Sequence, residues 1–596
     1  MKRYLSRKPV SIVWIVLSAC AVAAEPRVVA VPPCAAVRDM CVAADGEIRH
    51  YGRIFADGEV RRVCIASRDN GENWVTRPVV DGDVGAMVRS PYSGDWMYWR
   101  MLKDGKMQFL RSKTGPGDTS PEIMDFPWSN LELRQLLPLR SRRRWVAAFS
   151  DVACTRDGCY NATVALSDDD GWNWRRIDLK PVAGVERMAE GDQRPHWFNN
   201  GCEPSVVELS DGTLLMALRT SGPHAAFSRS TDGGETWSNG TPDSAFWQAN
   251  TMPYLFRLKD GRLLFIWNNT QMLPTRSATE YPELKEWELA GRGESAFTNR
   301  DALHAAISED DGRTWIGFRE IILNPVRNAA DFRELGNDPA QEHDKSVHQT
   351  QALELPNGKV LLALGQNVAA RRIVILDPAW LYETSRAEDF RCGLANLSTH
   401  LYVKSLTGGW RGWAGHCAWN RASGAMMVRD PDTCLSTKRE VLQLCRITDP
   451  RLVSDRQGVV WNFPAERKGR FEAECRIDGE GFRLALTDHW INPCDETNPR
   501  KSPVVFEIMP DRVGRGVWQR LVCEWDGDAE TVSLACGKLV VKGRMKACPR
   551  FGLSYLHLQT LASGFDPKGA YFRDFSMTGF PLADSVACHK GLPKGR

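Results

Sequence analysis

Ser67-Arg68-Asp69-Asn70-Gly71-Glu72-Asn73-Trp74 is an eight-residue phrase that recurs three times later in the chain. The later copies read SDDDGWNW at 167–174, STDGGETW at 230–237 and SEDDGRTW at 308–315. All four fit the pattern S-x-D-x-G-x-[TN]-W, which indicates a repeat architecture. Aspartate accepts hydrogen bonds from turn amides, glycine adopts a positive φ, and tryptophan packs a large ring beside the turn. The phrase therefore predicts four equivalent hairpin turns, and it carries no catalytic chemistry.

A second periodic feature is a set of Asp-Gly and Asn-Gly pairs between alternating apolar segments, which are hairpin signatures. These pairs are Asp45-Gly46, Asp211-Gly212, Asp260-Gly261 and Asn357-Gly358. Blade-like stretches start near residues 36, 84, 133, 203, 251 and 348. Together with these turns, the repeated phrase resembles the Asp-box, or BNR repeat, of bacterial sialidases and related β-propellers. The resemblance implies an all-β fold in which residues 34–390 form a six-bladed β-propeller.

The repeats stop before residue 395, and short runs of alternating hydrophobicity follow. These runs are Arg470–Ile477, Phe482–Leu486, Val504–Ile508, Trp518–Trp525, Thr531–Leu534 and Tyr555–Leu558. They predict an antiparallel β-sandwich over residues 395–596. Its outline is similar to the concanavalin-like domains attached to secreted glycosidases. Carbohydrate binding by this domain would rest on that analogy alone.

The N-terminus predicts export. A basic start, Met1–Lys8, precedes the apolar stretch Val10–Leu17 and a run of small residues ending at Ala24, so residues 1–24 read as a signal peptide. Leu17-Ser18-Ala19-Cys20 also resembles the bacterial lipobox, in which the cysteine becomes a lipid anchor. The alternative is ordinary cleavage after Ala24. No stretch reaches the roughly 20 apolar residues of a membrane helix. We expect a secreted, periplasmic or cell-surface protein without a transmembrane segment.

The counts of charged residues and of cysteines limit the kinds of ligand and cofactor that the chain is expected to bind. The 77 basic and 74 acidic residues leave a net charge of +3 and no long single-sign run, so nucleic-acid binding is not expected. Without Cys20, sixteen of the 17 cysteines remain, and export predicts disulfides among them, with Cys154 and Cys159 placed to close a small loop. No pair of CxxC units is present, so no metal or other cofactor is implied.

The segment Cys202–Arg219 is the most specific chemical signal in the chain. It resembles the sialidase segment that supplies an active-site glutamate and, sixteen residues later, the second of three arginines that grip the substrate carboxylate. Here these residues are Glu203 and Arg219. Two strands joined at Asp211-Gly212 would place both near one end of a hairpin, facing the propeller axis. Arginine suits the task because it stays charged and binds carboxylates bidentately.

Two further carboxylate-binding arginines are expected from the resemblance. Arg300, ahead of the fourth Asp-box, matches the position of the family's third arginine. Arg38 sits where the family has its first arginine, although the Arg-Ile-Pro phrase that normally follows is absent, so Arg49 or Arg53 could take its place. The family's general acid is an aspartate ahead of the first Asp-box, and Asp57 is the best-placed candidate. Asp57 also reads as an ordinary Asp-Gly turn residue.

The nucleophile is where the sequence departs from the family. Retaining sialidases use a tyrosine, and by the offset of Glu203 from Gly212 it should lie nine residues before Gly358, where this chain has Gln349. Three readings follow: Glu203 acts as a base on a water held by Gln349, His348 reaches the site through a bulge, or hydrolysis has been lost. Tyr254 is a weaker candidate that also reads as an interior aromatic residue.

Three functions are compatible with these residues. The first is an exported exo-glycoside hydrolase of the sialidase type, which removes a terminal sialic acid or related carboxylated sugar from glycans. The second is a catalytically inactive propeller that binds acidic glycans. The third is a structural or protein-binding propeller, because fold does not imply function. The retained carboxylate-binding pattern disfavours the third, and we expect the hydrolase.

Overall fold

The computed structural model describes the chain between residues 24 and 580 with gaps. The described residues are 24–33, 39–56, 59–79, 86–102, 104–151, 159–183, 185, 198–271, 300–325, 346–365, 368, 370–399, 401–403, 419–421, 425–433, 439–446, 457–493 and 499–580. Strands dominate these residues, and their helical segments are η4 (Pro378–Tyr382), η5 (Pro499–Lys501) and α2 (Pro510–Val513). None of the described helices has the length and apolar character needed to cross a membrane.

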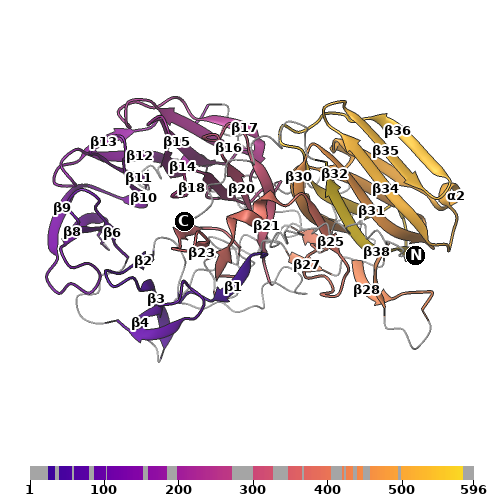
Figure 1. Ribbon diagram of the computed structural model, residues 1–596, viewed down its shortest axis with the longest axis horizontal. Coiled ribbons are helices and arrows are strands. Elements are labelled where there is room, and N and C mark those ends of the chain that lie inside the picture. The colour runs from indigo at the N-terminus through magenta and orange to yellow at the C-terminus, as the bar shows by residue number, and fades with distance from the viewer. Residues whose placement is uncertain are drawn as a thin grey trace, which may run out of the picture.

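Six groups of four antiparallel strands, called sheets 1 to 6 below, stand around a common centre in the first part of the molecule, and two of these groups are joined into one eight-stranded sheet (Figure 1). Sheet 1 contains β2 (Met40–Val42), β3 (Ile48–Ala56), β4 (Glu59–Ser67) and β5 (Val75–Pro78). Sheet 2 contains β6 (Val88–Arg89), β7 (Trp96–Met101), β8 (Lys106–Ser112) and β9 (Glu122–Ser129). Sheet 3 contains β10 (Leu131–Pro138), β11 (Trp145–Asp151), β12 (Cys159–Ser167) and β13 (Arg175–Asp178).

The second half of the ring repeats this order. Sheet 4 contains β14 (Phe198–Glu208), β15 (Leu214–Thr220), β16 (His224–Ser230) and β17 (Thr241–Trp247), and a short parallel pairing of β12 with β14 joins it to sheet 3. Sheet 5 contains β18 (Tyr254–Arg257), β19 (Leu263–Trp267), β20 (Ala302–Ser308) and β21 (Ile316–Leu323). Sheet 6 contains β22 (Gln351–Glu354), β23 (Val360–Leu364), β24 (Arg372–Leu376) and β1 (Arg27–Ala30). This radial arrangement is consistent with a β-propeller.

The turn chemistry read from the sequence is confirmed. Gly46, Gly212, Gly261 and Gly358 all have positive φ, and each closes a hairpin between the first and second strands of its sheet. Only glycine adopts this conformation without a steric penalty, which is why these pairs mark the hairpins.

The four Asp-box phrases form the loops between the third and fourth strands of sheets 1, 3, 4 and 5. In the first, Asp69 accepts from Ser67 Oγ at 2.8 Å and from the Asn73 amide at 2.9 Å, and Trp74 Nε1 donates to the Gly71 carbonyl at 2.9 Å. The same contacts recur in the other three copies. Each Asp-box phrase therefore stabilises its hairpin loop through these hydrogen bonds, as its residue types predicted.

The C-terminal part contains an eight-stranded and a four-stranded sheet, together with the pair β26 (Leu401–Val403) and β27 (Trp419–Arg421). The larger sheet contains β25 (Ser385–Glu388), β28 (Ala425–Arg429), β29 (Glu440–Arg446), β31 (Lys468–Ile477), β34 (Gln519–Asp526), β35 (Thr531–Cys536), β36 (Leu539–Arg544) and β38 (Asp566–Gly579). The smaller sheet contains β30 (Gly458–Glu466), β32 (Phe482–Thr487), β33 (Val504–Ile508) and β37 (Leu553–Thr560). Buried side chains of both sheets, such as Phe471 and Leu556, share one core. Each run predicted as a strand overlaps one of these strands, and only Trp518, at the start of its run, lies outside the matching strand β34.

Two strands depart from the expected domain limits. β1 precedes residue 34, yet it pairs with β24 and completes sheet 6. β25 precedes residue 395, yet it pairs with β38 in the C-terminal sheet. Both are short edge strands whose partners are far away in sequence, so no local pattern assigns them to a sheet.

The ring of sheets 1 to 6 contacts the C-terminal part of the molecule at sheet 5. Trp490 is 1% exposed and packs with Ala302 and Tyr555, while its backbone amide donates to the Asn269 carbonyl at 3.0 Å. The Tyr555 hydroxyl donates to Glu320 Oε1 at 2.6 Å. The contact is thus both apolar and hydrogen-bonded, and it lies on the same sheet that supplies Arg300 to the candidate site.

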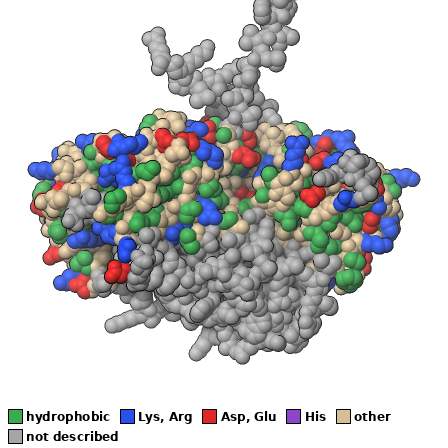
Figure 2. All heavy atoms as spheres, turned by 90° about the horizontal axis from the view of Figure 1, so that it is seen from below, with side chains coloured by type: hydrophobic (Ala, Val, Ile, Leu, Met, Phe, Trp, Pro, Cys, Tyr) green, Lys and Arg blue, Asp and Glu red, His purple; other side chains and the backbone are tan. Residues whose placement is uncertain are grey.

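The surface does not concentrate charge on the face that Figure 2 shows. Basic and acidic side chains are interspersed over the described part of that face. This matches the small net charge of +3. A charged ligand is therefore held by a local group of side chains rather than by a broad field.

Candidate functional site

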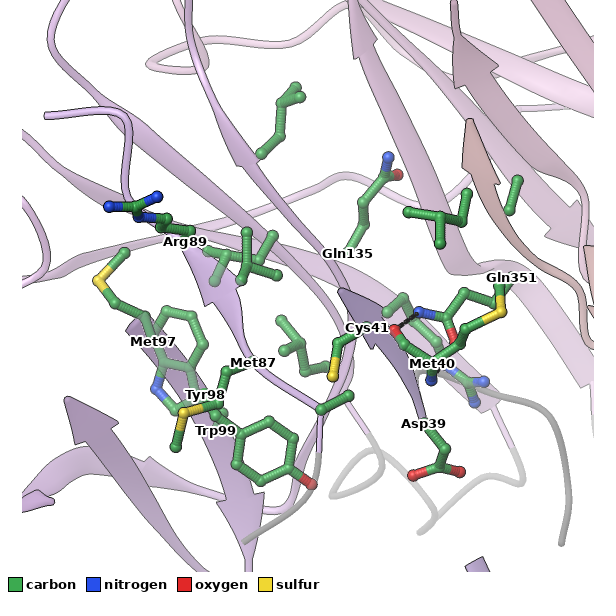
Figure 3. A pocket seen from close by; sticks show the side chains of 18 of the residues that line it. Asp39, Met40, Cys41, Met87, Arg89, Met97, Tyr98, Trp99, Gln135 and Gln351 are labelled. Atoms are coloured by element: carbon green, nitrogen blue, oxygen red, sulfur yellow. Dashed lines mark hydrogen bonds between the residues drawn. The ribbon is translucent and has the colours of Figure 1, made fainter. Parts of the chain in front are cut away.

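The first strands of the six sheets surround a cavity of about 1630 Å³ (Figure 3). Its walls include Met40, Met87 and Trp99, so much of the lining is apolar. Gln351 Nε2 donates to the Met40 carbonyl at 2.8 Å, and the Met40 amide donates to Gln351 Oε1 at 2.9 Å. These two hydrogen bonds join strand β22 of sheet 6 to strand β2 of sheet 1 within the wall of the cavity.

Glu203 lies on β14, and its backbone takes an unusual conformation. Its φ is +44°, which is rare for a residue other than glycine, and the register of β14 against β15 shifts between Cys202 and Ser205. The amide of Glu203 donates to Ser150 Oγ of sheet 3 at 3.0 Å. A strained backbone conformation that its surroundings hold in place is typical of functional sites.

The carboxylate of Glu203 is buried among three partners. Arg219 Nη1 donates to Oε2 at 2.7 Å, Arg134 Nη2 lies 2.8 Å from Oε1, and Gln349 Nε2 donates to Oε1 at 3.0 Å. The residue is 5% exposed. Burial alone would raise the pKa of Glu203, but the charges of Arg134 and Arg219 outweigh burial and hold it well below its usual range. Glu203 is therefore ionised at neutral pH, and the arginines are arranged around its carboxylate.

Asn250 positions two of the predicted arginines together. Its side-chain Oδ1 accepts from Arg219 Nε at 2.9 Å, and its backbone carbonyl accepts from Arg300 Nη2 at 2.5 Å. Asn250 also has a positive φ of 50°. This conformation directs the side-chain oxygen and the carbonyl of one residue to two guanidinium groups from different sheets, so Arg219 and Arg300 are neighbours in the site.

Gln349 stands opposite Glu203 with a φ of +59°. Its Nε2 donates to Glu203 and its Oε1 accepts from Arg134 Nη1 at 3.1 Å. The adjacent His348 has Nε2 3.2 Å from Arg300 Nη1. Gln349 and His348 lie where the family's tyrosine is expected, and both contact the cluster. Gln349 contacts Glu203 and Arg134, and His348 contacts Arg300. The offset from Gly358 correctly placed Gln349 beside Glu203.

Arg134 is one of the residues of this cluster that the sequence did not reveal. It lies on β10, its side chain is 8% exposed, and it also contacts Glu132 Oε2 at 2.7 Å and Ser150 Oγ at 3.3 Å. The hairpin between β10 and β11 contains no Asp-Gly or Asn-Gly pair from which an offset could be counted. The available signal was the alternation of Glu132 and Arg134 with leucines at the start of an inner strand.

The remaining candidates are less informative. Arg38 and Asp57 lie outside the described residues, as do residues 1–23 and Cys154, and the side chains of Arg53 and Cys159 are not described either. Arg49 Nε donates to Glu47 Oε2 at 2.9 Å, and Arg49 Nη1 to the Tyr51 hydroxyl at 3.3 Å, within sheet 1.

Tyr254 belongs to β18 and packs against the core between sheets 5 and 6, where burial raises its pKa. Tyr254 is partly buried and also lines the cavity. Within the described part of the chain, His, Cys, Asp and Glu side chains form no group of three or more that could hold a metal ion.

Residues 123–323 match the family described as BNR repeat-like domain, which confirms the resemblance read from the Asp-boxes. Among solved structures, the chain is similar to Trypanosoma rangeli sialidase in complex with sialic acid, with 13% identity, 92% of each chain covered and a TM-score of 0.30. A Dyadobacter fermentans protein of unknown function aligns with 18% identity over 59% of this chain and 97% of that chain, with a TM-score of 0.35. NanB, solved with Optactamide, aligns with 13% identity over 59% of this chain and 69% of that chain, with a TM-score of 0.37. No curated protein matches the sequence.

Proposed function

We propose that this protein is an exported exo-glycoside hydrolase of the sialidase type, which removes a terminal sialic acid or a related carboxylated sugar from glycans. Residues 34–390 act as a six-bladed β-propeller that carries the site, and residues 395–596 as a concanavalin-like β-sandwich. Residues 1–24 serve as the export signal, with a lipid anchor at Cys20 as the alternative fate of that signal. The protein then works in the periplasm, at the cell surface or outside the cell.

The observation that carries this proposal is the pair of arginines held by Asn250. Arg219 and Arg300 come from different sheets and share one hydrogen-bonding residue, so two guanidinium groups converge on one place. Arg134 adds a third positive charge, and Glu132 and Glu203 add two negative charges. These five groups carry a net charge of about +1 when ionised, and one substrate carboxylate would neutralise it. Arg38 is proposed as the remaining carboxylate ligand.

Hydrolysis needs an acid and an activated water molecule. We assign protonation of the leaving oxygen to Asp57, ahead of the first Asp-box. No tyrosine stands at Gln349, so the attacking group is water, and the glycoside is hydrolysed with inversion. His348 orients Arg300 through the contact between Nε2 and Nη1.

The test is sugar release by the full chain from a panel of α-linked sialosides and their deaminated analogues. We expect release by the wild-type protein and a rise in KM of at least about tenfold, or 1.4 kcal/mol, in Arg219→Met and Arg300→Met. Arg229→Met is the matched control because Arg229 is an exposed arginine on the neighbouring strand β16. An unchanged KM in both site variants would contradict the proposal, provided that thermal melting shows all variants folded.

A second function is favoured by one observation. The carboxylate of Glu203 is fully engaged by two arginines and Gln349, an arrangement that suits binding as well as catalysis. In that case the protein binds acidic glycans without cleaving them. Retained binding of a sialoside that Arg300→Met abolishes, together with no release from any substrate of the panel, would establish this alternative.

A further inference from the structure

Glu203 and Gln349 are both occupied by their neighbours. Arg134 contacts Glu203 Oε1 and Gln349 Oε1, and Gln349 Nε2 closes the ring by donating to Glu203. Glu203 Oε2 accepts from Arg219. A water molecule held by Gln349 would have to break this ring, and a carboxylate held by two arginines is a weak base. The pair is therefore poorly suited to activating water.

Glu132 is a second carboxylate on the same guanidinium group. Arg134 Nη2 lies 2.7 Å from Glu132 Oε2 and 2.8 Å from Glu203 Oε1, so one nitrogen bridges the two carboxylates. Glu132 and Arg134 are two residues apart on β10, and the ion pair between them brings their side chains together although the register of β10 against β11 shifts between Leu133 and Gln135. Both line the cavity.

The two carboxylates differ in their access to water. The side chain of Glu132 is 36% exposed, whereas that of Glu203 is 6% exposed. Both carboxylates are ion-paired to Arg134, and Glu203 is paired to Arg219 as well. Glu132 is therefore the member of the pair that faces the cavity and its solvent, and Glu203 is the inner member that fixes the arginines.

We propose that Glu132 is the general base that activates the attacking water, with Arg134 holding its carboxylate beside Glu203. The inference rests on the proposed hydrolase function and replaces Glu203 as the base of that reaction. A positioned base typically contributes a factor of about 10² to 10⁴ to the rate. Arg134 is then a positioning residue that links the base to the carboxylate-binding arginines.

The step balances without any other reactant. Glu132 takes a proton from water as the water oxygen forms its bond to the anomeric carbon. The bond from that carbon to the leaving oxygen breaks, its electron pair stays on the oxygen, and the general acid supplies the proton. Glu132 then releases its proton to solvent, and the general acid takes up a proton from solvent, so both groups return to their starting state. One water is consumed, and the products are the free sugar and the alcohol of the glycan.

The experiment is chemical rescue of Glu132→Ala in the full chain. Removing the carboxylate should lower kcat by about 10² to 10⁴, with a smaller change in KM. Added azide should fit the vacated space and attack directly, restoring turnover of an α-linked substrate and giving the β-glycosyl azide. A purely structural residue would show no such rescue and no such product.

Two control variants distinguish the loss of the general base from the loss of any other carboxylate. Glu122→Ala removes an exposed glutamate of β9 and should leave kcat unchanged. Asp39→Ala removes another carboxylate that lines the cavity and should not be rescued by azide. Rescue in Asp39→Ala instead of Glu132→Ala would overturn the proposal, as would a kcat in Glu132→Ala equal to that of Glu122→Ala. In both cases release by the wild type would leave the hydrolase function standing. No release by the wild type would overturn the function and the base together.

Discussion

At the residue scale, Asn250 tests the arrangement of the arginines. Asn250→Gly keeps a residue that tolerates a positive φ but removes the oxygen that accepts from Arg219. We expect a nearly unchanged melting temperature and an affinity for the carboxylated sugar about tenfold weaker, or 1.4 kcal/mol. Isothermal titration with the free sugar acid measures this affinity. An unchanged affinity would show that the position of Arg219 does not depend on Asn250.

Glu203 makes stability depend on pH in a defined direction. Its pKa in the folded protein lies below the ordinary value of 4.5, because Arg134 and Arg219 outweigh burial. The ionised carboxylate therefore stabilises the fold fully above pH 4.5, and this contribution is lost as the pH falls below that value. Glu203→Gln should cost about 3 kcal/mol at pH 7, since two buried arginines lose their partner. Urea unfolding should show the gap to the wild type shrinking towards pH 3, and a gap that does not depend on pH would contradict this account.

Single residues were predictable from the sequence where a counted offset reached them. Glu203 and Gln349 both lie nine residues before the glycine of a recognisable hairpin, and the structure brings them into contact. Arg134 has no such glycine, so its contact with Glu203, which comes from another sheet, could not be read from its own segment. Asn250 was not predictable for a different reason, because its role combines its side-chain oxygen, its backbone carbonyl and a positive φ at a position that belongs to no repeated motif.

At the element scale, the Asp-box loops are expected to carry stability and not activity. In the fourth copy, Asp310 accepts from Ser308 Oγ at 2.9 Å and from the amide and hydroxyl of Thr314 at 2.8 and 2.7 Å. Asp310→Ala should lower the free energy of unfolding by about 2 kcal/mol, because the loop amide at Thr314 loses its acceptor. The kcat at 25 °C should stay within about twofold of the wild-type value. A large loss of kcat in a variant that melts like the wild type would contradict the structural role.

Elements with a local signature were predicted, and elements defined by distant partners were not. The four hairpins with positive-φ glycines and the C-terminal strands such as Val504–Ile508 follow from turn residues and alternation. The strand β1 does not, because its place in sheet 6 depends on β24, which lies more than 300 residues further along the chain. Pairing over such a separation leaves no trace in the local sequence.

At the scale of the whole molecule, the contact at Trp490 should make the two parts unfold together. Its ring is buried against Ala302 of sheet 5 and Tyr555 of the C-terminal sheet. Trp490→Ala should cost about 3 to 5 kcal/mol and split the calorimetric unfolding of the wild type into two transitions. A variant that still unfolds in one transition would show that other contacts, such as that of Tyr555 with Glu320, are sufficient for coupling.

The all-β class and the radial arrangement of sheets were predictable because the repeated phrase encodes one unit many times. The contact between sheet 5 and the C-terminal sheet was not, since Trp490 and Asn269 are joined through backbone groups that any residue carries. The site falls between these cases, because the sequence pointed to Arg219 and Arg300, which both contact Asn250, but not to the carboxylate of Glu132.

The proposed reaction is hydrolysis by direct attack of water at the cluster of Glu132, Arg134 and Glu203. The most direct test is the anomeric form of the sugar that the full chain releases from an α-linked sialoside, followed by proton NMR in the first minutes. The account predicts that the β-anomer appears first, because water activated by Glu132 displaces the leaving group with inversion. Initial appearance of the α-anomer would contradict it and require a nucleophile that Gln349 cannot provide.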